Sequence, residues 1–356
     1  MKTKILQVIG CCILLLWTGC DTKDDVSDMS SDKIRLTMNV AANFSVSTRT
    51  ETALPEKEKI KTLRVIIIDG EGKVEYNDLI EQESGVEQIS NRTFQVSKNN
   101  NKKIYLLANV EGLSDLDPAN NDGLEERIKQ NISITSEYLS KTEYLPMSSC
   151  YEFRVEDENK DCGTLYVAYA TTKFTFTIKN EMPDSKKLGV SGLTINQIAD
   201  KSYLYPIVKN TEGEEDKFWL EKLENGEIIR SYEIPDMAEH APYDTGIEER
   251  IVIENGHEYS FPAVYVPESK YIVDGKQSYS LSINLGSGND ETNDRIRDLQ
   301  ISSNNKPLNS LFRNTHVNIT IVVKNLNEIE IIHGIYGMIN PWEDNDPVSG
   351  SIEEKK

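Results

Sequence analysis

Residues 166–179 have the sequence YVAYATTKFTFTIK, and its second half alternates apolar and polar side chains. Phe174, Phe176 and Ile178 fall on one side of an extended chain, and threonines fall on the other side. This period of two predicts a β-strand with one buried face. A fold built from strands is therefore the first expectation for the chain.

The same signal recurs on both sides of this stretch. Turn chemistry such as Asp69-Gly70 and Asn255-Gly256 separates the strand patterns, while helical signals are short and restricted to 123–130 and 307–312. Many short strands with polar turns predict an all-β fold of the sandwich type, with short helices in its loops. The further strand patterns are at 34–40, 63–68, 103–110, 279–285 and 317–323.

A chain of 356 residues is long enough for two domains of ordinary size. The polar stretch 180–187 ends one set of strands before Leu188 starts another. We therefore expect an N-terminal β-sandwich domain at 53–183, a C-terminal β-sandwich domain at 184–342 and a polar tail at 343–356.

The start of the chain is typical of a lipoprotein signal peptide at 1–19. Two lysines precede an apolar stretch, 5–17, that is too short to cross a bilayer. Cleavage between Gly19 and Cys20 would leave an acylated Cys20, and two acyl chains hold a domain on a membrane. The adjacent Lys23-Asp24-Asp25 favours export to the outer face of the cell outer membrane. The alternative is an ordinary signal peptide with a chance cysteine.

The charge restricts the partners. A formal net charge of -20 disfavours binding to nucleic acid and to anionic membrane surfaces. The four histidines are isolated, and no zinc spacing, nucleophile elbow or phosphate-binding glycine loop occurs, so we expect no enzyme, no cofactor and no metal. The chain has many carboxylates, so a glycosidase, which uses a pair of them, stays an alternative. A glycan-binding surface lipoprotein is a second alternative, with its sugar platforms among Tyr203, Tyr205, Trp219, Tyr265 and Trp342.

Two cysteines, Cys150 and Cys162, remain after the signal region. The segment between them suggests a strand, a polar turn at 156–160 and a returning strand. A hairpin of this size brings two cysteines within bonding reach, and a disulfide is allowed outside the cytoplasm. The pair is therefore a candidate disulfide, with two free thiols as the alternative.

The strand at 34–40 has one apolar face and leads into a polar, Ser- and Thr-rich connection, 43–55. That connection contains Arg49, which a trypsin-like protease could cut. If the strand fills a groove between two others, its loss exposes an apolar slot and unpaired backbone that another copy's strand could occupy. The alternative is a permanent edge strand. The four apolar residues are Ile34, Leu36, Met38 and Val40.

Several motifs resemble the fimbrillin family, the subunits of type V pili. The N-terminal ones are ALPEKEKIKTLRV at 53–65 and KIYLLANV at 103–110, and others occur in order over most of the mature chain. The later motifs lie at 168–174, 198–204, 265–268, 313–316 and 340–342.

The resemblance implies two transthyretin-like β-sandwich domains in tandem and a precursor carried to the surface as a lipoprotein. It also implies that an arginine-specific protease cuts between Arg49 and Thr50, within a lipidated N-terminal segment at 20–52 that carries the removable strand. A C-terminal strand of another pilin subunit would then fill the slot, so that the mature form resides in a fimbrium that supports adhesion and biofilm. The candidate donor residues are Ile331, Ile335, Met338, Ile339 and Trp342.

The end of the chain leaves the role within a pilus open. Gly334 and Gly337 would weaken a regular donor strand, and the tail at 343–356 is polar. Arg49 favours a stalk subunit, while the weak donor leaves room for an accessory subunit at the tip or as an anchor.

Overall fold

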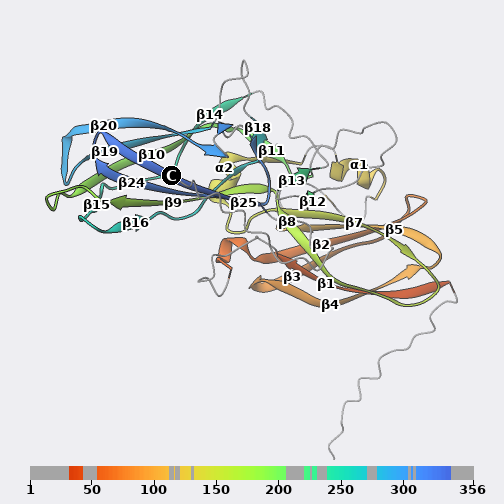
Figure 1. Ribbon diagram of the computed structural model, residues 1–356. Helices are drawn as coiled ribbons and strands as arrows, with labels where there is room; N and C mark the ends of the chain where they lie inside the picture. Colours follow the sequence, from red (N-terminus) through yellow and green to blue (C-terminus); the bar gives the residue numbers. More distant parts are fainter. Residues whose placement is uncertain are drawn as a thin grey trace, which may run out of the picture.

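The computed structural model describes residues 32–42, 54–111, 116, 121–129, 132–205, 220–224, 227–230, 239–270, 279–303, 306–307 and 310–337. They form two β-sandwiches that lie side by side, the N-terminal one at the right of Figure 1 and the C-terminal one at the left. The prediction of an all-β fold with two sandwiches in tandem is confirmed.

The N-terminal sandwich has the strand order β3-β2-β5-β7-β8-β1-β4. β7 and β8 share only the pairs Met147 with Tyr169 and Ser148 with Ala168, so the path divides there into two layers. One layer is β3-β2-β5-β7 and the other is β8-β1-β4. Their bounds are β1 Lys33–Ala42, β2 Ile60–Asp69, β3 Val74–Val86, β4 Gln88–Ser97, β5 Asn100–Ala108, β7 Met147–Val155 and β8 Lys160–Tyr169.

The nearly continuous apolar stretches at 63–68 and 103–110 lie largely in strands that are buried on both faces. Residues 63–68 of β2 are all buried, as are residues 104–108 of β5. Leu124 and Ile128 of α1 (Leu124–Lys129) join the same core as these strands. The expected short helix at 123–130 is therefore present, and its apolar side chains contribute to the N-terminal core.

The C-terminal sandwich has two layers. In one layer β10 pairs with β14, β15 and β19, and β19 pairs with β20; in the other β9 pairs with β16, β17 and β24, and β24 pairs with β25. The bounds are β9 Thr171–Asn180, β10 Leu188–Ala199, β14 His240–Asp244, β15 Ile251–Ile253, β16 Glu258–Ser260, β17 Val264–Pro267, β19 Ser280–Ser287, β20 Asp290–Gln300, β24 Thr315–Asn325 and β25 Glu328–Gly337.

The two sandwiches repeat one topology. β1 runs parallel to β8 and antiparallel to β4, and β9 likewise runs parallel to β24 and antiparallel to β16 and β17. In each half the first strand therefore lies in the middle of a layer. β25 comes after this repeated set as an added strand beside β24.

The predicted boundary at 183/184 needs correction. β9 pairs with β24 over nine residue positions, and Phe174, Phe176 and Ile178 belong to the second core. The sandwiches therefore divide near Thr171, between β8 and β9. The sequence gives no turn signal there, since β8 runs almost directly into β9. The polar stretch 180–187 connects β9 to β10 within the C-terminal sandwich.

Short elements complete the described chain. The helix expected at 307–312 is wrong, because residues on both sides of 308–309 pair as short strands. The remaining elements are η1 Glu56–Glu58, α2 Ser136–Lys141, and the strand pairs β6 Ser133–Thr135 with β11 Lys201–Tyr203, β12 Leu220–Glu224 with β13 Glu227–Arg230, β18 Ser269–Lys270 with β23 Ser310–Leu311, and β21 Ser302–Ser303 with β22 Lys306–Pro307.

Candidate strand-exchange site

β1 occupies a groove whose two walls are β4 and β8. It pairs with β4 from Lys33–Ser97 to Ala41–Gln88 and with β8 from Leu36–Lys160 to Ala42–Val167. Figure 1 shows β1 and β4 together at the lower right of the molecule. β1 is an interior strand, so the alternative of a permanent edge strand is wrong. Ile34, Leu36, Met38 and Val40 are at most 3% exposed and point into the core.

Both walls carry a bulge at the same level of β1. The pairing with β4 shifts by one residue after Met38, where Asn91 has a φ of 55° and its N–H donates to Asn39 Oδ1 at 2.9 Å. The pairing with β8 shifts between Thr37 and Asn39, next to Gly163 with a φ of 65°. Bulges fix strand register. A strand in this groove is thus held in register from both sides.

One residue fastens both ends of the connection that leads away from β1. The N–H of Ala42 donates to the carbonyl oxygen of Glu87 at 2.9 Å, and the N–H of Leu54 donates to Glu87 Oε1 at 2.9 Å. The chain therefore leaves the groove and joins the sandwich again at the same place. The predicted protease site Arg49–Thr50 lies outside the described residues, as do Gly19 and Cys20.

Part of the candidate donor segment has a place in its own sandwich. β25 pairs with β24 from Asn325–Glu328 to Thr315–Gly337 and forms the end of its layer. Ile331 is half-buried against the C-terminal core, and Ile335 lies in the same strand. Met338, Ile339 and Trp342 lie outside the described residues.

Cys150 and Cys162 are free thiols, so the candidate disulfide is not formed. β7 and β8 pair only at Met147–Tyr169 and Ser148–Ala168 and then separate into two layers, so the regular hairpin expected between the two cysteines does not form. Burial raises the pKa of the Cys162 thiol to about 11.

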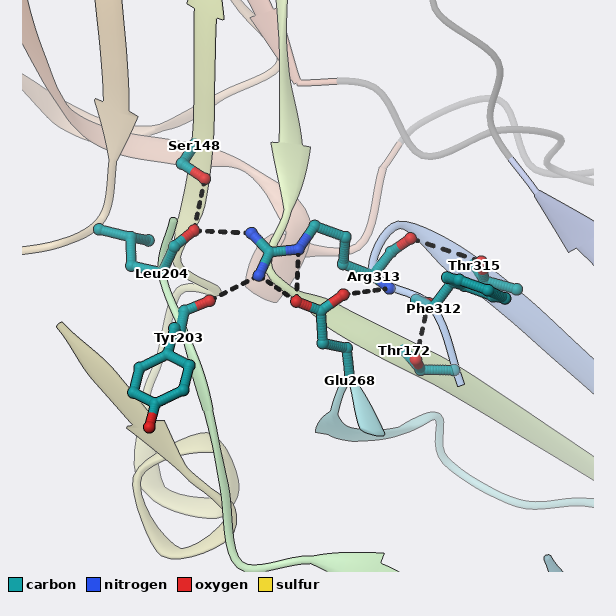
Figure 2. Close-up of polar contacts among 8 residues, drawn as sticks. All are labelled: Ser148, Thr172, Tyr203, Leu204, Glu268, Phe312, Arg313 and Thr315. Atoms are coloured by element: carbon teal, nitrogen blue, oxygen red, sulfur yellow. Dashed lines mark hydrogen bonds and ion pairs between the residues drawn. The ribbon is translucent and has the colours of Figure 1, made fainter. Parts of the chain in front are cut away.

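A buried ion pair joins the two sandwiches (Figure 2). Arg313, fully buried just before β24, donates from Nε to Glu268 Oε1 at 2.8 Å, and the two side chains form an ion pair. Its other nitrogens donate to the carbonyl oxygens of Leu204 and Tyr203 at 2.7 and 2.6 Å. The Leu204 carbonyl also accepts from Ser148 of β7 at 2.6 Å, which links the cluster to the N-terminal sandwich.

A second buried ion pair lies nearby. Glu58 of η1 pairs with Lys173 of β9 at 2.7 Å and accepts from the Tyr265 hydroxyl at 2.5 Å. The Tyr169 hydroxyl donates to the Glu58 carbonyl oxygen. The chain that re-enters after residue 53 is therefore anchored at once to both sandwiches.

These contacts give a structural role to three of the sequence motifs. The motifs at 198–204, 265–268 and 313–316 converge on Arg313 and Glu268. Glu268 at the end of the largely apolar stretch 265–268 was the available signal for a buried charge. The positions of Arg313 and Glu268 along the chain gave no indication that these residues would be in contact.

Two of the five candidate sugar-platform residues are buried, and Tyr203 is half-buried. Tyr205 and Tyr265 are each 5% exposed, which makes them unsuitable as sugar platforms, while Trp219 and Trp342 lie outside the described part. Within the described part, no cluster of three or more His, Cys, Asp or Glu side chains forms a metal site, and no helix is both long and apolar enough to span a membrane.

One family model matches the N-terminal part of the chain. Residues 33–192 match the family described as "Major fimbrial subunit protein (FimA)", which confirms the resemblance to fimbrillins. The match covers the whole N-terminal sandwich, including β1, and the start of the C-terminal one. No curated protein matches the chain.

Solved structures share the fold at low sequence identity. A candidate cell adhesion protein from Parabacteroides distasonis ATCC 8503 has a TM-score of 0.53 and 13% identity, covering 88% of this chain and 100% of that chain. The tip fimbrial protein Mfa3 from Porphyromonas gingivalis has a TM-score of 0.51 and 12% identity, covering 86% and 100%. A candidate cell adhesion protein from Bacteroides eggerthii DSM 20697 has a TM-score of 0.50 and 12% identity, covering 85% and 95%.

Proposed function

We propose that this chain, which matches the major fimbrial subunit family over residues 33–192, is a structural subunit of a surface fimbrium that joins its neighbours by donor-strand exchange. The family match supports a pilus or adhesion component without catalytic activity. The observation that supports strand exchange is the position of β1, an interior strand connected to the rest of the fold through residues 43–53.

The equivalent strand of the C-terminal sandwich differs in how it is held. β9 occupies the same topological position as β1, but the chain runs into it almost directly from β8 and leaves it through a short turn to β10. Removing β9 would require two cuts within the folded body. Removing β1 requires one cut in the connection after it, which is where Arg49 lies.

The burial of the apolar face of β1 means that its groove needs a replacement strand once β1 has left. Burying four apolar side chains at roughly 1.5–3 kcal/mol each gives about 6–12 kcal/mol of gross stabilisation. An empty groove would expose this apolar surface and the inward backbone of both walls. A strand from a second copy can satisfy both at once.

The proposed sequence of events begins with a lipoprotein precursor anchored through Cys20 on the outer membrane. An arginine-specific protease then cuts after Arg49, β1 leaves with the lipidated segment, and Thr50 becomes the new N-terminus. The donor is the C-terminal region from Ile331 to Trp342 of a neighbouring subunit. Because β25 pairs with β24, donation requires either release of β25 or use of residues beyond Gly337.

Arg49 favours a stalk subunit over an anchor, since an anchor would retain its lipid. The shared fold with a tip fimbrial protein does not separate stalk from tip.

The direct test is limited digestion of the purified precursor with an arginine-specific protease. We expect one dominant cut after Arg49, and then ladders of polymers that resist detergent in the cold. Arg49→Ala should keep the chain as lipidated monomers. The matched control is Arg154→Ala, which removes an exposed arginine from β7 and should leave both cutting and assembly unchanged. A precursor that is cut after Arg49 yet stays monomeric would contradict strand exchange.

A further inference from the structure

The outer edge of the wall β4 is held by side chains from the opposite layer. The Tyr76 hydroxyl of β3 accepts from the N–H of Gln95 at 2.9 Å and donates to the carbonyl oxygen of the same residue at 3.1 Å. Its ring lies edge-on against Phe94, with centroids 5.1 Å apart. Two residues further along, Glu75 Oε1 accepts from the N–H of Ser97 at 2.8 Å.

The outer edge of the other wall, β8, is held in the same way. The Tyr151 hydroxyl of β7 accepts from the N–H of Tyr166 at 2.9 Å and donates to the carbonyl oxygen of that residue at 2.7 Å. Ser149 Oγ donates to the same carbonyl at 2.5 Å. Each wall of the groove thus has one residue whose two backbone groups are both bonded by a tyrosine hydroxyl from the other layer.

These bonds lie on the side of each wall that faces away from β1. Backbone N–H groups alternate between the two edges of a strand. Since the groups of Gln95 and Tyr166 point outward, the amides of Val96 and Leu165 point toward β1. Loss of β1 therefore breaks the inward bonds and leaves the tyrosine bonds intact.

We propose that Tyr76 and Tyr151 are positioning residues for strand exchange, an inference that rests on the function proposed above. They keep the two walls in place while the groove is empty. They also occupy the outer backbone edges, so that the open positions face into the groove. An incoming strand from a second copy of this chain then pairs inside the groove and not along the outside of a wall.

The walls need such support because β1 is their main strand partner. Without β1, β4 keeps no strand partner in the described part of the chain, and β8 keeps two residue pairs with β7. A strand with two open edges would either detach or pair with the wrong partner. The tyrosine hydroxyls bond the walls independently of β1.

Native-state hydrogen exchange of the uncleaved precursor tests the role of the two tyrosines without any proteolysis. Release of β1 by local opening exposes the amides of Val96 and Leu165, whereas those of Gln95 and Tyr166 should exchange at least about tenfold more slowly. Tyr76→Phe leaves the outward N–H of Gln95 without its acceptor, so Gln95 should then exchange faster than Val96, which β1 still protects. Tyr151→Phe should reverse the order of Tyr166 and Leu165 in the same way. Equal exchange rates of outward and inward amides in the unaltered protein would overturn the proposal.

The rate at which a peptide refills the empty groove distinguishes a positioning role from a purely stabilising one. Precursor cut after Arg49 is stripped of β1 in mild denaturant, and a synthetic peptide of residues 32–42 is then added. Removing both hydroxyls with Tyr76→Phe and Tyr151→Phe should slow peptide binding about tenfold or more. The control Tyr259→Phe, at an exposed residue of β16, should bind the peptide at the unaltered rate.

The two experiments separate the role of the tyrosines from the proposed function. If the unaltered protein is not cut, or binds no peptide after cutting, strand exchange is contradicted whatever the exchange rates show. If it binds peptide and the double variant does so equally fast, Tyr76 and Tyr151 are not positioning residues.

Discussion

Arg313 is the residue whose loss the fold should tolerate least. Arg313→Met leaves Glu268 buried without its cation and removes the donors to Leu204 and Tyr203. Breaking a buried ion pair by removing one partner costs about 3–5 kcal/mol. We expect urea denaturation of the precursor to show a loss of this size. Lys141→Ala, which removes an exposed ion pair with Glu137, should leave the denaturation midpoint in place.

His316 gives the stability a dependence on pH. Burial, reinforced by the charge of Lys173, lowers its pKa to about 4, and Thr175 Oγ1 lies 2.8 Å from its Nε2. In the unfolded chain the imidazole has a pKa of about 6.5. Between these values the unfolded chain binds the proton and the native chain does not, so stability falls as the pH drops from about 6.5 to about 4.

The difference between the two pKa values corresponds to about 3 kcal/mol. Denaturation midpoints measured between pH 7 and pH 4 should therefore fall less steeply for His316→Gln than for the unaltered protein. His257→Gln, at an exposed position, should retain the full slope. Parallel pH profiles for His316→Gln and the unaltered protein would contradict the assignment.

At the level of single residues, the alternation of apolar and polar side chains was sufficient to predict burial. The inward positions of β1, from Ile34 to Val40, are buried as expected. The partners of Arg313 and Glu58 could not be predicted, because their contacts join residues far apart in the chain. Asn109 is a similar case: within the motif KIYLLANV it accepts from the N–H groups of Lys61 and Thr62, which explains why this motif accompanies KIKTLRV.

Among the elements, β1 should be held mainly by its buried face. Leu36→Ala removes a fully buried side chain, which costs about 2–5 kcal/mol. After cutting at Arg49, we expect the fragment that contains β1 to dissociate from this variant at lower urea concentration than from the unaltered protein. Thr37→Ala, on the outward face of the same strand, is the control. Equal release from both variants would show that burial does not retain β1.

Element boundaries were harder to predict than element types. Turn residues at 180–187 suggested a domain boundary, yet they connect two strands of one sandwich. The true division near Thr171 has no such signal, because a single residue, Ala170, separates β8 from β9. The bulges beside Met38 and Asn39 and the tyrosine contacts on β4 and β8 depend on strand pairing, which periodicity does not specify.

For the whole molecule, strand exchange requires that β1 leave before a neighbour can bind. Thr37 and Thr93 lie directly opposite each other on β1 and β4, with their hydroxyl oxygens 3.3 Å apart. Opposite positions of this kind bring side chains close enough for a disulfide. Thr37→Cys with Thr93→Cys should therefore lock β1 in its groove under oxidising conditions.

The locked protein should be prepared with Cys150→Ser and Cys162→Ser, because Cys162 lies in the bulge beside β1. We expect the arginine-specific protease to cut it after Arg49 while the fragment stays attached, so that gel filtration shows monomers only. Adding a reductant should release β1 and start polymer growth in the same sample, whereas Thr37→Cys alone should polymerise without reductant. Polymers that form at the unaltered rate from the oxidised, cut protein would mean that subunits join through a surface other than this groove.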